Sequence, residues 1–162
     1  MKSYVATDNT SRSLIQRKRL AVFVSGEGSN FKAIHEAAKE GLVHGDITIL
    51  VTDKPGLRNF EVNFLLLAGF LKLIPVELVQ AFPRSILNIH PSLLPAFSGK
   101  GFYGLKVHKA VIASGARYSD PTVHFVDEQY DTGRIVAQRV VPVLADDTAE
   151  QLAARVLHQV SK

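Results

Sequence analysis

The chain contains no cysteine among its 162 residues. Without a thiol it cannot form a disulfide, use a thiolate nucleophile or hold a metal ion through sulfur. A reducing compartment is compatible with this absence but is not established by it. Long apolar runs are missing as well, because the best candidate, residues 64–70, is far shorter than the roughly 20 residues that span a bilayer. We therefore predict that no segment crosses a membrane and that this stretch forms a buried strand.

A general excess of positive charge is also lacking, although the formal net charge is +4. Residues 1–19 hold five of the 19 basic residues and one of the 15 acidic residues, so residues 20–162 carry 14 of each sign. A neutral body lacks the electrostatic footprint of a nucleic-acid-binding protein. We predict no nucleic-acid partner.

The basic segment 1–19 is rich in serine and threonine and poor in acidic residues. That composition is typical of an organelle transit peptide, and a disordered terminus explains it equally well. With 46% hydrophobic residues in the chain and balanced charge in the body, residues 20–162 are expected to fold as one globular domain.

Beyond residue 20, apolar strand patterns alternate with helix patterns. Phe31, Ile34, Ala37 and Ala38 share one helical face, for example, and Gly41 ends that helix. The alternation predicts an α/β fold of Rossmann-like type, with a mostly parallel sheet and helices on both faces. The expected strands are 20–24, 47–51, 62–67 and 85–89, then 122–126 and 135–141, and the expected helices begin near 29, 75, 103 and 148.

The junction at residues 52–61 does not fit this pattern, because a parallel crossover needs a dozen or more residues and usually contains a helix. Either the flanking strands pair in an antiparallel way, or a helix-containing unit of roughly 30 residues is absent. We favour the absence, so the domain is expected to be incomplete near 52–61.

Residues 25–30 read Ser-Gly-Glu-Gly-Ser-Asn between a predicted strand and a predicted helix. Free backbone N–H groups and the helix dipole at such a place favour an anion, typically phosphate. The segment is neither a dinucleotide fingerprint nor a P-loop. A simple helix cap made by Ser29 or Asn30 explains it about as well.

Asn88 and His90 stand at the carboxyl end of a predicted parallel strand, where ligands bind in open α/β sheets. Strand alternation places both side chains on one side, so an amide and an imidazole could converge on one reacting group. A structural histidine is the usual alternative, but the strand end and the stiff Pro91 and Pro95 favour a functional site.

The acidic turn 127–133 joins two strands, and its carboxylates would ordinarily be solvated. A carboxylate facing His90 would form a pair suited to proton transfer near neutral pH. His124 lies in the strand that leads to this turn and either lines the cleft or packs within the strand. His108 lies in a predicted helix and does not stand out as a site residue.

Three segments in this order resemble the glycinamide ribonucleotide formyltransferases: residues 25–30, residues 88–95, and residues 123–126 leading to Asp131. The resemblance runs from Leu20 to about Gln159, and the stretches 68–72 and 131–135 look like the plant members in particular. It implies transfer of a formyl group from 10-formyltetrahydrofolate to the amine of 5-phosphoribosylglycinamide in de novo purine synthesis. It also implies small-molecule substrates, no metal, a monomer or weak dimer, and a plastid stroma location, with the cytoplasm as the alternative.

Carried over by position, the resemblance implies that Asn88, His90 and Asp131 form the catalytic trio. Asn88 would donate a hydrogen bond to the formyl oxygen, and His90 would act as a cation that helps hold the negative charge and supplies a proton to the folate nitrogen. Asp131 would orient His90, favour its protonated form and accept the proton of the amine through a water molecule. The substrate phosphate would lie at Gly28, Ser29 and Asn30. The folate cleft would comprise Leu71, Lys72, Leu73, Ile74, Asp127, Glu128, Gln129 and Tyr130.

The chain departs from the family pattern in three places. The family has a strand and a helix where this chain has 52–61, continues beyond Lys162 into a further helix, and has a glycine at Asp120. The domain is therefore expected to be incomplete at the C-terminus as well as near 52–61. The rival expectations are a formyltetrahydrofolate hydrolase, a methionyl-tRNA formyltransferase, or a shortened and inactive interaction or regulatory form.

Overall fold

A computed structural model describes residues 17–24, 29–51 and 62–160. Its centre is a six-stranded sheet in the order β2-β1-β3-β4-β6-β7, and a separate two-stranded sheet pairs β5 with β8. The strands are β1 (Lys18–Val24), β2 (Gly45–Val51), β3 (Phe64–Ala68), β4 (Ile86–His90), β5 (Tyr118–Ser119), β6 (Thr122–Phe125), β7 (Ile135–Gln138) and β8 (Val141–Pro142). The helices are α1 (Ser29–Lys39), α2 (Val76–Ala81), α3 (Leu105–Ala113) and α4 (Ala149–Val160).

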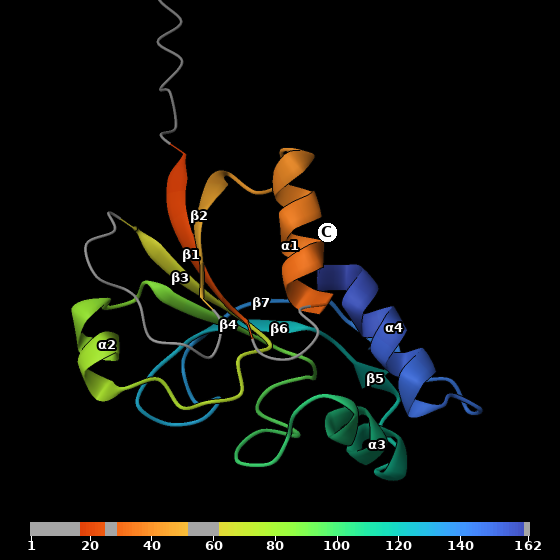
Figure 1. Ribbon diagram of the computed structural model, residues 1–162. Helices are drawn as coiled ribbons and strands as arrows, with labels where there is room; N and C mark the ends of the chain where they lie inside the picture. The colour runs from red at the N-terminus through yellow and green to blue at the C-terminus, as the bar shows by residue number, and fades with distance from the viewer. Residues whose placement is uncertain (1–16, 25–28, 52–61, 161–162) are drawn as a thin grey trace, which may run out of the picture.

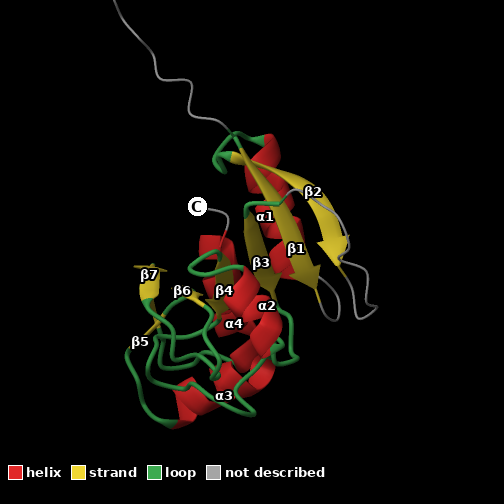
Figure 2. Cartoon of the chain, turned by 90° about the vertical axis from the view of Figure 1, so that its left-hand side faces the viewer, coloured by secondary structure: helices red, strands yellow, loops and turns green. Residues whose placement is uncertain are grey.

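Helices cover both faces of the sheet, as Figures 1 and 2 show. The reason lies in the period-two alternation of β1, where Ala21 and Phe23 pack in the apolar cluster that includes residues of α2. Val22 and Val24 point the other way and pack with Ile34 of α1 and Val160 of α4. A strand that is apolar on both faces must be covered on both, which is typical of parallel sheets. The predicted fold class is confirmed.

The four strands β2, β1, β3 and β4 are parallel, and β6 and β7 complete the sheet in antiparallel orientation. Because β2 and β3 both pair in parallel with β1, the antiparallel alternative for the junction at 52–61 is wrong. The junction itself lies outside the described residues, so the expected missing unit stays a prediction.

The strand predicted over 135–141 is in fact two strands, and this part of the prediction was wrong. β7 ends at Gln138 and pairs with β6, whereas β8 pairs with β5 in the small sheet. Because β7 and β8 pair with strands of different sheets, the chain must leave the main sheet between Gln138 and Val141. Only tertiary contacts decide where it leaves.

The first strand begins at Lys18, two residues earlier than predicted. Just before it, Arg17 forms an ion pair with Asp46 at 2.9 Å.

Two helices pack beneath the end of the sheet where β4 stops. Val107 and Val111 of α3 contact Leu152 and Val156 of α4 in one buried cluster. α4 begins with a capping box, in which the Thr148 backbone N–H donates to Gln151 Oε1 and the Gln151 N–H donates to Thr148 Oγ1. This cap and the buried cluster hold α4 along one wall of the cavity described next.

Candidate active site

The carboxyl end of β4 opens into a cavity of about 650 Å³. Asn88 and His90 line it, as the strand alternation predicted, and His90 is the last residue of the strand. Further lining comes from the loop after β3, from the loop before α3, from the turn after β6 and from one face of α4. Segments far apart in the sequence thus meet at the strand end.

His90 is buried, with 3% of its surface exposed. Its Nε2 donates to the carbonyl oxygen of Phe97 at 2.9 Å, which leaves Nδ1 facing Asp131. Burial lowers the pKa of His90 below its ordinary value, and the opposing influence of Asp131 offsets this only in part. Asp131 therefore favours the protonated ring, as expected, but desolvation has the larger effect.

Asp131 lies in the turn between β6 and β7 with φ +57°, a left-handed conformation that aspartate tolerates better than most residues. Its Oδ2 is 3.6 Å from His90 Nδ1 and accepts a hydrogen bond from the Gly99 backbone N–H at 3.0 Å. Its Oδ1 is 3.6 Å from His124 Nε2. One carboxylate therefore lies between two imidazoles, and the main chain of the loop before α3 holds it there.

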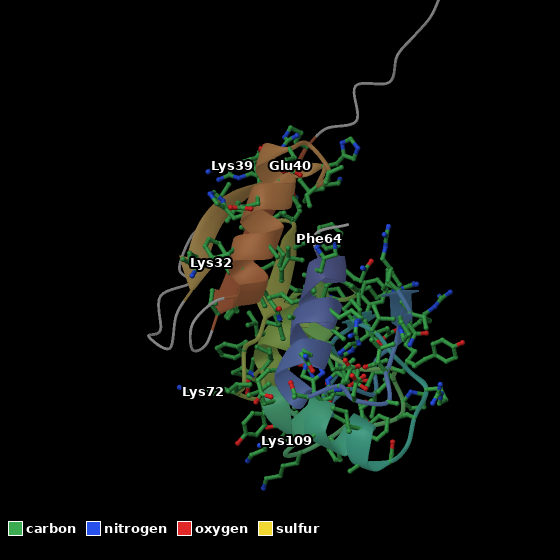
Figure 3. All side chains as sticks on the ribbon, turned by 90° about the vertical axis from the view of Figure 1, so that its right-hand side faces the viewer. Lys32, Lys39, Glu40, Phe64, Lys72 and Lys109 are labelled. Carbon is green, nitrogen blue, oxygen red and sulfur yellow. The ribbon has the colours of Figure 1, made fainter. Side chains whose placement is uncertain are left out.

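Most residues expected at the folate cleft do lie at the cavity. The lining includes Leu71, Lys72, Leu73, Ile74, Asp127, Gln129 and Tyr130, but not Glu128. Figure 3 shows the Lys72 side chain extending outward at the end of the molecule where α3 lies. The Asp127 carboxylate is engaged within its own turn, because it accepts hydrogen bonds from the Gln129 backbone N–H and the Thr132 hydroxyl.

Of the residues expected to hold the phosphate, Asn30 lines the cavity near the start of α1. Ser29 is the first residue of that helix, and Gly28 lies outside the described residues. The amide nitrogen of Asn30 lies beside Gly69, where a Cβ atom would approach it to 3.8 Å. The start of α1 and the loop after β3 thus meet at the cavity.

Sequence reasoning left His124 undecided and passed over His108. Both are buried, and both line the cavity. His124 Nε2 lies 3.0 Å from the Asn88 amide nitrogen, and its Nδ1 donates to the carbonyl oxygen of Phe125 at 2.8 Å. Desolvation, with a smaller effect of the neighbouring His90, lowers the pKa of His108 to about 4. The strand position of His124 left both possibilities open, and no local signal showed that His108 faces the site.

The chemistry available here is proton transfer and stabilisation of a developing negative charge. An amide, two imidazoles and a carboxylate line one cavity, and both imidazoles are buried, so hydrogen bonds there act more strongly than in water. Within the described ranges, no three histidine or carboxylate side chains are grouped so that they could hold a metal ion. Among the helices of those ranges, none is long and apolar enough to cross a membrane.

Comparisons with known proteins agree with this geometry. The family model described as formyl transferase matches residues 56–162. The phosphoribosylglycinamide formyltransferase of Bacillus subtilis is 35% identical, over 86% of this chain and 87% of its own length. The chain belongs to the phosphoribosylglycinamide formyltransferase family.

The chloroplastic phosphoribosylglycinamide formyltransferases of Vigna unguiculata and Arabidopsis thaliana are 61% and 55% identical over 90% and 91% of this chain. The chain spans only about three fifths of the length of these relatives, 58% and 63%. The first alignment runs over 180 positions, more than the 162 residues present here, so that relative has positions without a counterpart in this chain.

Solved structures show the same fold. Glycinamide ribonucleotide transformylase 1 from Symbiobacterium toebii superposes with a TM-score of 0.78 at 30% identity, covering 90% of this chain and 83% of its own. The corresponding protein from Geobacillus kaustophilus superposes with a TM-score of 0.76 at 34% identity, covering 90% and 93%. The predicted family and fold are therefore both confirmed.

Proposed function

We propose that this protein transfers a formyl group from 10-formyltetrahydrofolate to the amine of 5-phosphoribosylglycinamide, a step of purine synthesis. The observation that carries the proposal is the placement of the Asp131 carboxylate beside His90 in the cavity that Asn88 also lines. Family membership supports the reaction type, and the names of the plant relatives support phosphoribosylglycinamide as the acceptor. The amine nitrogen bonds to the formyl carbon, the bond from that carbon to the folate nitrogen breaks, and one proton moves from the amine to the departing nitrogen.

Asn88 is proposed to stabilise the oxygen of the tetrahedral intermediate. Its side chain reaches the cavity from the end of β4, so an amide N–H is available where the formyl carbonyl gains negative charge. Removing one such donor costs about 2.7–4 kcal/mol of transition-state stabilisation in enzymes where it has been measured. We expect a loss of that order in Asn88→Ala.

His90 and Asp131 are proposed to move the proton as a pair. Burial keeps the pKa of His90 low, so its ring is ready to accept a proton as the amine attacks. The Asp131 carboxylate at 3.6 Å then stabilises the imidazolium through its negative charge. The same pair can return the proton to the departing folate nitrogen, which balances the reaction without another acid.

The two substrates are proposed to occupy different parts of the cavity. The phosphate of the ribonucleotide is assigned to the start of α1, at Gly28, Ser29 and Asn30, where backbone N–H groups and the helix dipole favour an anion. The folate is assigned to the surface formed by residues 71–74 and 127–130, of which all but Glu128 line the cavity. Its apolar members, Leu71, Leu73 and Ile74, suit a flat aromatic ring.

A plastid location is proposed as well. The plant relatives are named chloroplastic, and the first 19 residues are basic, rich in hydroxyl side chains and poor in acids. Expression of the chain with a C-terminal fluorescent protein in plant cells tests this. Fluorescence confined to chloroplasts is expected, and a uniform cytoplasmic signal would contradict it.

The reaction itself is tested by an absorbance assay of the purified chain with a 10-formylfolate donor. We expect donor loss only when glycinamide ribonucleotide is present, with the formylated product detected by mass spectrometry. Donor loss without the amine would indicate a hydrolase. No turnover in either case, from a protein that unfolds cooperatively, would indicate an inactive form.

A further inference from the structure

We propose that His124 is a positioning residue for formyl transfer, because it sets the orientation of the Asn88 side-chain amide. This inference rests on the proposed function of the cavity and goes beyond the trio of Asn88, His90 and Asp131. It is carried by a chain of contacts that runs from the β6–β7 turn, through His124, to the end of β4.

The contact between Asn88 and His124 joins two nitrogen atoms, Nδ2 and Nε2, at 3.0 Å. An amide nitrogen donates hydrogen bonds but does not accept them, so the imidazole nitrogen must be the acceptor. His124 Nε2 therefore carries a lone pair, and the ring proton is on Nδ1. The Nδ1–H in turn donates to the carbonyl oxygen of Phe125 at 2.8 Å, which is the partner that this tautomer requires.

This tautomer allows Asn88 only one orientation of its amide. If the amide were rotated by half a turn, its Oδ1 would face the Nε2 lone pair at about the same distance, and two acceptors would repel each other. In the observed orientation one N–H is held by His124, and the second N–H remains free to donate to a developing oxyanion. Without the imidazole, the amide could present its oxygen instead, and that oxygen would repel the negative charge.

The protein backbone supports the His124 tautomer from behind. The register between β6 and β7 shifts between Val123 and His124, as at a β-bulge, which is a common way to re-aim a side chain near an active site. Gly133 packs against the Phe125 carbonyl so closely that a Cβ atom would lie 1.8 Å from its oxygen. The carbonyl that accepts from His124 thus stands in a place that only glycine at 133 permits.

An ion pair between His124 and Asp131 explains the position of the His124 ring less well than the hydrogen bond with Asn88 does. The two are 3.6 Å apart, which is too long for a hydrogen bond, and the Nε2 atom that faces Asp131 is the one that accepts from Asn88. The titratable groups facing this ring are Asp131 from the turn and His90 from β4. Because His124 directs its Nε2 lone pair at Asn88, the Asp131 carboxylate also remains available to act with His90.

A double-mutant cycle in the full chain tests the proposal. His124→Phe keeps a ring of similar size but removes the acceptor, and His124→Gln places an acceptor near the position of Nε2. We expect His124→Phe to lower kcat by 10- to 100-fold with KM for both substrates changed less than threefold, and His124→Gln to recover most of the loss. In an Asn88→Ala background, His124→Phe should cause little further loss, because His124 acts through Asn88.

Multiplying effects in the double mutant would overturn the proposal, and so would equal losses in the Phe and Gln variants. His158→Phe serves as the control, because His158 lies near the end of α4 and does not line the cavity. This variant should keep wild-type kcat.

A second measurement needs no catalysis and therefore separates this inference from the proposed function. Ring-nitrogen NMR of the ¹⁵N-labelled wild-type chain at pH 7.5 should show His124 protonated on Nδ1 and unprotonated on Nε2. The Nε2 signal should move in Asn88→Ala, where the donor is lost. A proton on Nε2 would overturn the inference even in an active enzyme. If the wild type transfers no formyl group, the proposed function fails, and the proposed positioning role fails with it, whatever the tautomer.

Discussion

His90 Nδ1 and Asp131 Oδ2 lie 3.6 Å apart in a site where both side chains are at least 90% buried. This separation is too long for a direct hydrogen bond, but at this burial the two groups still interact strongly through charge. Protonation of His90 would turn the contact into an ion pair. Loss of the carboxylate charge should therefore affect catalysis much more than folding.

Asp131→Asn tests that expectation. The amide Oδ1 can still accept from the Gly99 N–H, so the chain should fold and bind substrates as before. The imidazolium would lose its counter-charge, and we expect kcat to fall by about 10²- to 10⁴-fold, the usual contribution of acid–base groups. Steady-state kinetics with a thermal melt measure both effects. Turnover near that of the wild type would refute the role of Asp131, and the exposed Asp146→Asn serves as the charge-matched control.

His108 should make the fold sensitive to acid. Its pKa is about 4 in the folded chain and 6.5 in the unfolded chain, so between these values the unfolded chain binds more protons. The free energy of unfolding therefore has its full value above about pH 6.5 and decreases as pH falls towards 4, by on the order of 3 kcal/mol. In His108→Phe the free energy of unfolding, measured in urea from pH 7.5 to 4.5, should fall less steeply. An unchanged slope would contradict the assignment.

Asp120 should have the opposite pH dependence. Its side chain is fully buried, with Oδ1 accepting from the Thr122 hydroxyl and Oδ2 without a hydrogen-bond partner in the described part of the chain. Burial raises its pKa, so the folded state keeps the proton to a higher pH than the unfolded state, and stability is lost as pH rises through the raised value.

The φ angle of Asp120 is not positive, so the backbone does not require the glycine expected at this position.

Asp120→Asn removes this charge while keeping the acceptor for Thr122. We expect the variant to be more stable than the wild type at pH 7.5 by about 1–2 kcal/mol, because an ionised group is no longer buried. The difference should disappear below about pH 4, where the wild-type carboxyl becomes protonated in both states. Chemical denaturation at the two pH values measures it, and a destabilised variant at pH 7.5 would contradict the prediction.

Gly133→Ala should destabilise the β6–β7 turn. A Cβ atom there would meet the Phe125 carbonyl oxygen at 1.8 Å, and that carbonyl belongs to the backbone and cannot rotate away. We expect a loss of about 2–3 kcal/mol, as for overpacking elsewhere. Gly41→Ala is the control, because Gly41 has φ +76° but a Cβ atom there would have no neighbour within 4 Å, so backbone strain alone should cost about 1 kcal/mol. Equal losses would show that close approach is not the cause.

Local patterns predicted most of the fold. The alternation in β1, where Phe23 and Val22 face opposite helices, follows from side-chain periodicity, and so does the shared face of Asn88 and His90 on β4. The division of 135–141 into β7 and β8 was missed, because one apolar run looks the same whether it pairs with one strand or two. Pairing partners are contacts at long range, and no local pattern contains them.

The sequence by itself determined the parallel sheet, the strand end that bears Asn88 and His90, and the family to which the chain belongs. Only the tertiary structure placed Asp131 between His90 and His124 and brought His108 to the same cavity. Distances between side chains on separate elements depend on how those elements pack, and burial then decides their protonation. For that reason the low pKa of His90 could not be foreseen from a sequence that showed only its neighbours along the chain.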